Sequence, residues 1–392
     1  MNFTNRYFSL FLTAVLFTAC IDSSLNSKPV SPSPTSQDFP VPSETPAVQP
    51  HQDESKEILA YKTETFAGSG IQGHRDGNLL EAQFTSIRNA CFNPKTQEMY
   101  LLDNHRIRKI TPQKTVVTIA GSDKPGYKDG VAEQSLFSYP QDCLVEPNGN
   151  LLILDQFNQR IRKLSPDGFV STFAGNGNDL VQDGFLTSTS FSYLQNITIF
   201  NGQVIVSDGF RLRKINQDSI FTLNHKQTTS NEYGGPKPSL PIDSIEGRIE
   251  DVYFGSRLLL SKLNDNILVI ADMDLGLLFT LNEKNEIVHI IPDRSDFSER
   301  YGYFPEKFND IATYKNQLIV ADSNNFQLLE MSSQKPKISD AAFLDEHNEL
   351  QFTSIQILMV LEDKNEMYYF NSGTQKIEKI ILTQPQKMNL PS

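Results

Sequence analysis

The sequence has no tryptophan, only three cysteines and six histidines, and no long apolar run. None of the histidines stands beside a cysteine or a second histidine at the spacing of a metal site. There is also no G-x-S-x-G, H-E-x-x-H, P-loop or C-x-x-C motif, so the sequence indicates none of the chemistries that these motifs carry. The 47 acidic residues outnumber the 35 basic ones, and the net charge of -12 argues against nucleic acid as a partner because phosphates repel an acidic protein.

The first apolar stretch, SLFLTAVLF, is too short to span a bilayer and is typical of a targeting signal. It leads into the residues FTAC at 17–20, which resemble the lipobox of bacterial lipoprotein signal peptides. This resemblance implies a signal peptide over 1–19 and a membrane anchor through a lipid on Cys20; the alternative is an ordinary secretory signal. Ile21 stands where lipoproteins kept in the inner membrane usually have Asp. The chain is therefore expected in a bacterial cell envelope, on the periplasmic or surface face of the outer membrane.

Residues 20–57 are rich in Ser, Pro, Thr and Gln, as in SKPVSPSPTSQDFPVPSETPAVQP. They have too few large apolar side chains to form a core, and their prolines favour an extended chain. We predict a disordered tether over 20–57, a folded domain over 58–384 and a short C-terminal tail over 385–392.

One pattern recurs along the folded part. An apolar run ends in an acid, a polar turn follows, and basic and apolar residues then alternate, as in LLILDQFNQRIRKL from residue 151. Three copies are strong and three are weaker, and a fixed period of this kind indicates a repeat architecture. The residues that end the apolar runs, which we call the anchor acids although the sixth is an amide, are Asp103, Asp155, Asp208, Asp272, Asp322 and Asn371.

Each copy predicts four short strands separated by Pro, Asn, Asp and Gly turns. Six four-stranded units predict an all-β fold, a six-bladed β-propeller with four-stranded antiparallel blades. KTETFAG at 62–68 precedes the first full unit, and the sixth unit ends after its third strand. The N-terminal strand should therefore complete the last blade and close the ring.

The pattern DG…A-x-F…LD-x-x-N-x-RIRK-x…V-x-TFAG, specific over 62–215, resembles that of NHL-repeat propellers. The resemblance implies six blades but no single function, because such propellers include protein-binding scaffolds, sensor domains, RNA binders and a metal-dependent lyase. The lyase members rely on histidines in the central channel, and we predict no histidine there.

A ring of oxygen-bearing side chains is predicted at the mouth of the central channel. Carboxylate and amide oxygens are the ligands that Ca²⁺ takes, so a divalent cation is one reading of this ring, with the three aspartates as its ligands. The other reading is that the ring satisfies backbone groups around a water-filled channel, in which case no cofactor is expected. The ring positions are Asn89, Asp142, Asn196, Asp251, Asp310 and the apolar Ile357.

Phe157 and Phe210 follow two of the anchor acids, in loops that share one face of the ring. Exposed aromatic side chains on a rigid face are typical interface anchors. The acids of this loop face should either make it acidic or accept hydrogen bonds from turn N–H groups. The RIRK segments should pair with nearby acids, the alternative being a basic stripe for an anionic polymer. In the second unit, Ile161 should point inward and Arg160 and Arg162 outward.

Cys91 and Cys143 lie on the first strands of adjacent units. Export permits a disulfide, and the strand faces allow one. Two separate buried thiols are nevertheless expected, because the range of Cα separations that a disulfide tolerates is narrow.

These features favour a lipid-anchored, non-catalytic scaffold that binds a protein or glycan partner through its acidic loop face. The alternative is a metal-dependent hydrolase or lactonase, in which a cation at the channel mouth polarises a substrate carbonyl.

Overall fold

The computed structural model describes residues 57–224, 247–252, 254–274, 276–289, 309–321, 326–331, 337–344, 350–351 and 355–389. The predicted signal peptide, Cys20, nearly all of the tether and the fifth anchor, Asp322, lie outside these residues. The described residues are strands and turns with a few short 3-10 helices, so the all-β prediction is confirmed.

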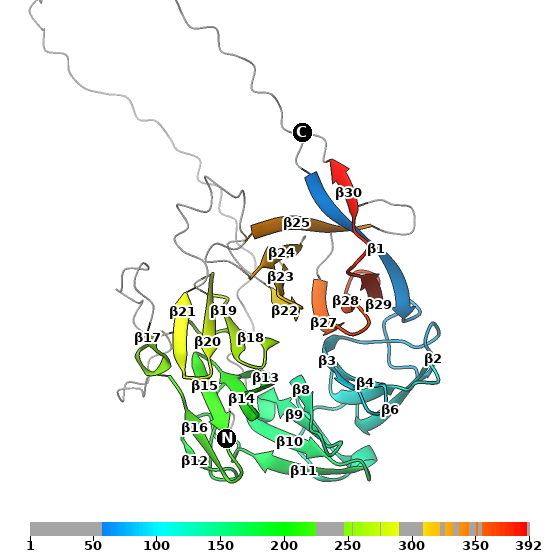
Figure 1. The fold of residues 1–392 in the computed structure, drawn as a ribbon. Helices are drawn as coiled ribbons and strands as arrows, with labels where there is room; N and C mark the ends of the chain where they lie inside the picture. Colours follow the sequence, from blue (N-terminus) through cyan, green and yellow to red (C-terminus); the bar gives the residue numbers. More distant parts are fainter. Residues whose placement is uncertain are drawn as a thin grey trace, which may run out of the picture. The chain divides into compact units, whose positions relative to one another are not determined.

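Six blades surround a common centre (Figure 1), and the inner strand of each contacts the inner strand of the next until the sixth contacts the first. This arrangement confirms the six-bladed propeller. From the centre outward, the first three blades are β3 (Ile87–Asn93), β4 (Glu98–Asp103), β5 (Arg106–Ile110) and β6 (Thr115–Gly121); β8 (Pro140–Val145), β9 (Leu151–Asp155), β10 (Arg160–Leu164) and β11 (Phe169–Ala174); and β13 (Leu194–Phe200), β14 (Gln203–Asp208), β15 (Arg211–Ile215) and β16 (Ser219–Thr222).

The last three blades have the same order in the sheet, and the outermost strand of the sixth comes from the N-terminal end of the folded part. They are β18 (Leu258–Asn264), β19 (Ile267–Asp272), β20 (Leu277–Asn282) and β21 (Glu286–His289); β22 (Asp310–Tyr314), β23 (Gln317–Ala321), β24 (Phe326–Glu330) and β25 (Lys337–Leu344), which also pairs with β26 (Leu350–Gln351); and β27 (Ile355–Leu361), β28 (Glu366–Asn371), β29 (Lys376–Ile381) and β1 (Glu57–Ala67).

Four blades carry a fifth strand of two residues that pairs with the outermost long strand. These fifth strands were not predicted from the sequence. In three of these strands the first residue is the glycine of a repeated Asp-Gly pair, with φ values between 124° and 149°. Residues with a side chain rarely adopt this conformation, which accounts for the glycine at each position. The extra strands are β2 (Gly77–Asn78), β7 (Gly130–Val131), β12 (Gly184–Phe185) and β17 (Gly247–Arg248).

The predicted closure is confirmed, because residues 63–67 of β1 pair antiparallel with β29 and complete the sixth blade. The start of β1 goes further: residues 59–62 pair parallel with β25 of the fifth blade. On its other edge, residues 57–60 pair with β30 (Gln386–Asn389), which lies in the segment expected to be a tail. β1 therefore joins the fifth and sixth blades in one sheet.

The apolar core lies between neighbouring blades. The second strands are buried on both faces, and all five residues of β9 are buried. Phe84, Phe137 and Phe191, which follow the Asp-Gly pairs, are completely buried. Packing between blades therefore fixes the inner strands, which line the central channel.

Candidate functional site

Three completely buried arginines each form an ion-pair network within one of the first three blades. Arg162 pairs with Asp155 at 2.8 Å and with Asp129, and its guanidinium lies 5.1 Å from the ring centre of Phe137. The prediction that Arg162 points outward is wrong: its strand is covered on both faces, so the alternation of residue types does not separate an exposed face from a buried one. The predicted pairing with acids is confirmed for Arg162 and its two equivalents but not for Arg160, which donates to backbone carbonyl oxygens. The equivalent sets are Arg108 with Asp103, Asp76 and Phe84, and Arg213 with Asp208, Asp183 and Phe191.

The anchor acids of these blades do not make the loop face acidic, contrary to one of the two expectations. Asp103, Asp155 and Asp208 are completely buried. Each accepts backbone N–H groups from the segment before its own inner strand, such as the N–H of Ser138 on Asp155 Oδ1 at 2.7 Å. Their role is the other expected one, since they satisfy turn N–H groups and neutralise a buried arginine.

The central channel holds a cavity of about 290 Å³, and the structure brings most of the predicted ring together around it. Asp251 is the exception, because it lies in the 3-10 helix of Ile249–Asp251 before β18. Leu259 takes its position. The sequence held the correct signal: Leu259 follows Phe254 by five residues, as Asn89 follows Phe84. The ring residues that line the cavity are Asn89, Asp142, Asn196, Leu259, Asp310 and Ile357.

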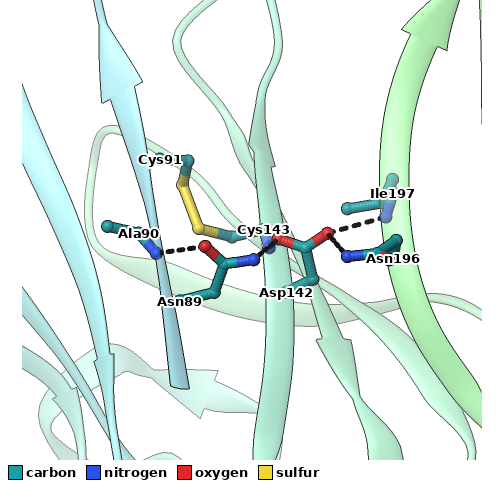
Figure 2. The surroundings of a disulfide bond; sticks show 7 residues. All are labelled: Asn89, Ala90, Cys91, Asp142, Cys143, Asn196 and Ile197. Atoms are coloured by element: carbon teal, nitrogen blue, oxygen red, sulfur yellow. Dashed lines mark hydrogen bonds between the residues drawn. A yellow bond between two sulfur atoms is a disulfide. The ribbon is translucent and has the colours of Figure 1, made fainter. Parts of the chain in front are cut away.

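Hydrogen bonds occupy both oxygens of the Asp142 carboxylate (Figure 2). Oδ1 accepts from Asn89 Nδ2 and from the N–H of Cys143, each at 2.8 Å. Oδ2 accepts from Asn196 Nδ2 at 3.1 Å and from the N–H of Ile197 at 2.8 Å. A carboxylate has about four acceptor positions, so this set uses them all. Asp142 therefore ties the inner strands of the first three blades together.

Burial raises the pKa of Asp142 to about 7. Burial also raises the pKa of Asp310 to about 7, and the nearby charge of Asp142 adds to this effect. Asp310 Oδ1 accepts the N–H of Ile311 at 2.9 Å. The two carboxyl groups across the channel are thus the acids of the ring whose protonation changes near neutral pH.

The ring does not fit a calcium ion, which takes about six to eight oxygen ligands. Asp251 lies away from the ring, and the four donors around Asp142 compete for the lone pairs that a cation would need. In the described part of the chain, no three His, Cys, Asp or Glu side chains are placed to share a metal ion. The arrangement fits the other reading of the ring, in which the side chains satisfy backbone N–H groups.

Cys91 and Cys143 form a disulfide beside this ring (Figure 2), so the expectation of two separate thiols is wrong. The bond joins β3 to β8, with a Cα separation of 5.9 Å. This separation falls within the range of about 4.4–6.8 Å that disulfides adopt. The inner strands of adjacent blades are in contact, which brings the two cysteines close enough.

The two predicted aromatic anchors of the loop face differ. Phe157 is 61% exposed, and its ring centre lies 4.7 Å from that of Tyr139, which in turn lies 4.4 Å from that of His105. Phe210 is half-buried, packs against the core of the fourth blade and stacks on Arg211. Only Phe157 is therefore available as an anchor. Tyr139 and His105 belong to no motif, so the sequence did not identify them.

Exposed apolar side chains are unevenly distributed over the described residues. All the large ones lie in the first three blades and their connecting loops, between residues 71 and 221. Single exposed apolar residues are normal on a protein surface, so among these side chains only Phe157, with its ring contact to Tyr139, marks a candidate contact site. No helix in the described residues is long and apolar enough to cross a bilayer.

Comparison with known proteins supports the fold and identifies no function. No family model matches the chain. The protein SUPPRESSOR OF QUENCHING 1, chloroplastic, of Arabidopsis thaliana is 41% identical over 68 residues, which are 17% of this chain and 6% of that protein. The chain thus matches only a small part of that relative.

Several solved structures share the architecture at low sequence identity. One classed as a gluconolactonase has a TM-score of 0.51 and 9% identity, covering 85% of this chain and 94% of the other. Virginiamycin B lyase from Staphylococcus aureus with quinupristin has a TM-score of 0.47 and 13% identity, covering 84% and 97%. An auxiliary nutrient-binding protein from Bacteroides thetaiotaomicron has a TM-score of 0.38 and 10% identity, covering 83% and 76%. At these identities, the likeness extends to the fold alone.

Proposed function

We propose that this chain is an NHL-type propeller, anchored to the bacterial cell envelope through a lipid on Cys20, that acts as a non-catalytic scaffold for a protein or glycan partner. The observation that carries the proposal is Phe157, an aromatic side chain 61% exposed on a rigid blade and stacked on Tyr139. Exposed aromatic residues with fixed geometry lose little conformational entropy on binding, which makes them effective anchors.

The disulfide between Cys91 and Cys143 supports the proposed compartment. Disulfides persist in exported proteins and are rare in the reducing cytosol. The outer membrane, on its periplasmic or surface face, is the site that Ile21 favours.

The contacts of the channel residues support a binding scaffold over the alternative, a metal-dependent hydrolase. The hydrolase needs carboxylates free to hold a cation, whereas Asp142 is fully hydrogen-bonded and Asp251 lies outside the ring. Binding through the loop face requires no change in the hydrogen bonds of the channel.

The test is retention on cell-envelope fractions of the purified full chain carrying Cys20→Ser, which removes the proposed lipid so that retention reports the loop face. Replacing Phe157 by Ala should reduce the retained amount at least fivefold, because the anchor is lost. Asp310→Asn, in the channel, is the matched control and should leave retention unchanged. Loss of retention with Asp310→Asn and not with Phe157→Ala would place binding in the channel and contradict the proposal.

A further inference from the structure

The backbone at Tyr139 departs from the repeat. In the first and third blades the corresponding residues, Ser86 and Tyr193, donate their N–H groups to the anchor acid of their own blade, at 2.9 and 2.7 Å. In the second blade, the N–H of Tyr139 instead donates to Nδ1 of His105, which belongs to the first blade, at 3.3 Å. The backbone before β8 therefore differs from that of the first and third blades, although the anchor acid Asp155 is present.

This backbone conformation places Tyr139 in the left-handed region, with φ of 52°. The other described non-glycine residues with positive φ are Asn, Gln or Lys, so Tyr139 is the one aromatic residue among them. Bulky side chains are strained in this conformation. Such strain persists where the surrounding structure holds it, often at sites that bind a ligand.

The result is a continuous row of three rings, which we call the aromatic row: His105, Tyr139 and Phe157. The rings of His105 and Tyr139 meet edge to face at 85°, and those of Tyr139 and Phe157 are tilted by 46°. The backbone N–H of Phe157 donates to the carbonyl oxygen of Ser138 at 3.1 Å, which fixes the loop that carries the outermost ring. The aromatic row is thus preorganised by the start of the inner strand β8 and by the turns that follow β4 and β9.

The charged groups around the aromatic row already have partners of their own. Burial, with a contribution from Arg106, lowers the pKa of His105 below its usual value, so the imidazole is neutral at pH 7. Its Nδ1 accepts a hydrogen bond, which leaves the proton on Nε2 as a donor. Arg106 pairs with Asp123, and Arg160 lies over the ring of Tyr127 while donating to backbone carbonyls. A ligand on the aromatic row would therefore be matched best if it were neutral.

We propose that the aromatic row binds a neutral oligosaccharide, with one sugar ring stacked on Phe157, which Tyr139 holds in place. One face of a sugar ring presents C–H groups, which pack against the electron-rich face of an aromatic ring, while its hydroxyl groups remain free for hydrogen bonds. This inference rests on the proposed scaffold function and names the class of its partner. A protein partner, the other class, is an outcome of the test below.

The test is calorimetric titration of the full chain with maltohexaose, cellohexaose and chitohexaose, and with hexagalacturonate as a charged comparison. At least one neutral hexamer should bind saturably, and Phe157→Ala should weaken its affinity at least tenfold. Phe185→Ala removes a phenyl ring that is 69% exposed on the outer rim, and should change the affinity less than twofold. His105→Ala should also weaken binding, since His105 positions Tyr139.

A second measurement is independent of calorimetry. The chain has no tryptophan, so Phe157→Trp introduces a single tryptophan, at the site itself. Its emission should change on adding the neutral hexamer that binds and not on adding hexagalacturonate.

Two results would overturn the inference: no neutral hexamer binds, or one binds equally to the parent and to Phe157→Ala. If no sugar binds and Phe157→Ala still lowers retention on envelope fractions, the scaffold function stands with a protein partner. If retention is also unaffected, both proposals fail.

Discussion

Arg162 shows how single residues of the repeat determine its stability. Its guanidinium is completely buried, and its charge is compensated by Asp155, also buried, and by the partly exposed Asp129. A buried charge without a partner is costly, so each residue of such a set depends on the others. The RIRK and Asp-Gly patterns are far apart in the sequence, yet they supply one ion-pair network.

We predict that Arg162→Met lowers the free energy of unfolding by about 3–5 kcal/mol, because Asp155 is left buried without its cation. Arg160→Met, on the same strand, is the matched control and should cost about 1 kcal/mol or less, because Arg160 is only half-buried and bonds backbone carbonyls. Urea denaturation of the two variants measures both values. Equal losses would contradict the role assigned to the buried pair.

Asp310 should contribute a pH dependence to stability. Its folded pKa of about 7 lies above the ordinary value of 3.8, so the folded state favours the protonated form. Its contribution to stability is fully present below pH 4 and is lost as the pH rises through 7. Asp310→Asn should therefore be more stable than the parent at pH 8 and nearly equal to it at pH 4.

Urea denaturation at several pH values measures this difference. Asp265→Asn, at a side chain that is 91% exposed, is the control and should not alter the pH profile. An Asp310→Asn profile parallel to that of the parent would show that Asp310 does not titrate in this range.

The sequence predicted the pairing of the arginines but not their burial, because the pattern of residue types is the same for a strand covered on one face or on both. It predicted Asn89, Asp142 and Asn196 in the ring because each follows a strong repeat signal. It also placed Asp310 there, although the fifth unit is a weak copy of the repeat. It missed His105 and Tyr139 because their contact joins different blades through a backbone conformation that no motif encodes.

At the level of the elements, β1 closes the ring and a disulfide reinforces the contact between two consecutive blades. β1 completes the sixth blade and also pairs with the fifth, while the disulfide links the inner strands of the first and second. The closure by β1 was predictable, because a spare strand stood at one end and a missing strand at the other. The inner strand of the fourth blade was harder to place. The blade lacks the RIRK motif, and Asp251 resembled a ring residue although Leu259 occupies the ring position.

We predict that Cys91→Ser/Cys143→Ser lowers the free energy of unfolding by about 2–4 kcal/mol, since the bond closes a loop of 52 residues. Thermal melts with and without a reducing agent measure the effect. The reductant should lower the melting temperature of the parent and leave that of the double variant unchanged. Identical melts of the oxidised parent and the double variant would contradict a stabilising bond.

At the level of the whole molecule, six similar blades form a ring, and the candidate contact site lies on two adjacent blades. In the described residues, the large exposed apolar side chains belong to the first three blades, and the aromatic row lies between the first and second. The channel, in contrast, is lined by side chains that are largely occupied with backbone N–H groups. We therefore infer that the loop face binds the partner and that the channel has a structural role.

Photo-crosslinking in living cells tests this assignment most directly. A benzophenone amino acid would replace Phe157 on the loop face in one full-length variant and Phe185 on the outer rim in another; both side chains are more than 60% exposed. We predict a discrete, light-dependent adduct with an envelope protein or glycan from position 157 and none from position 185. No adduct from position 157, or the same adducts from both positions, would contradict binding through the loop face.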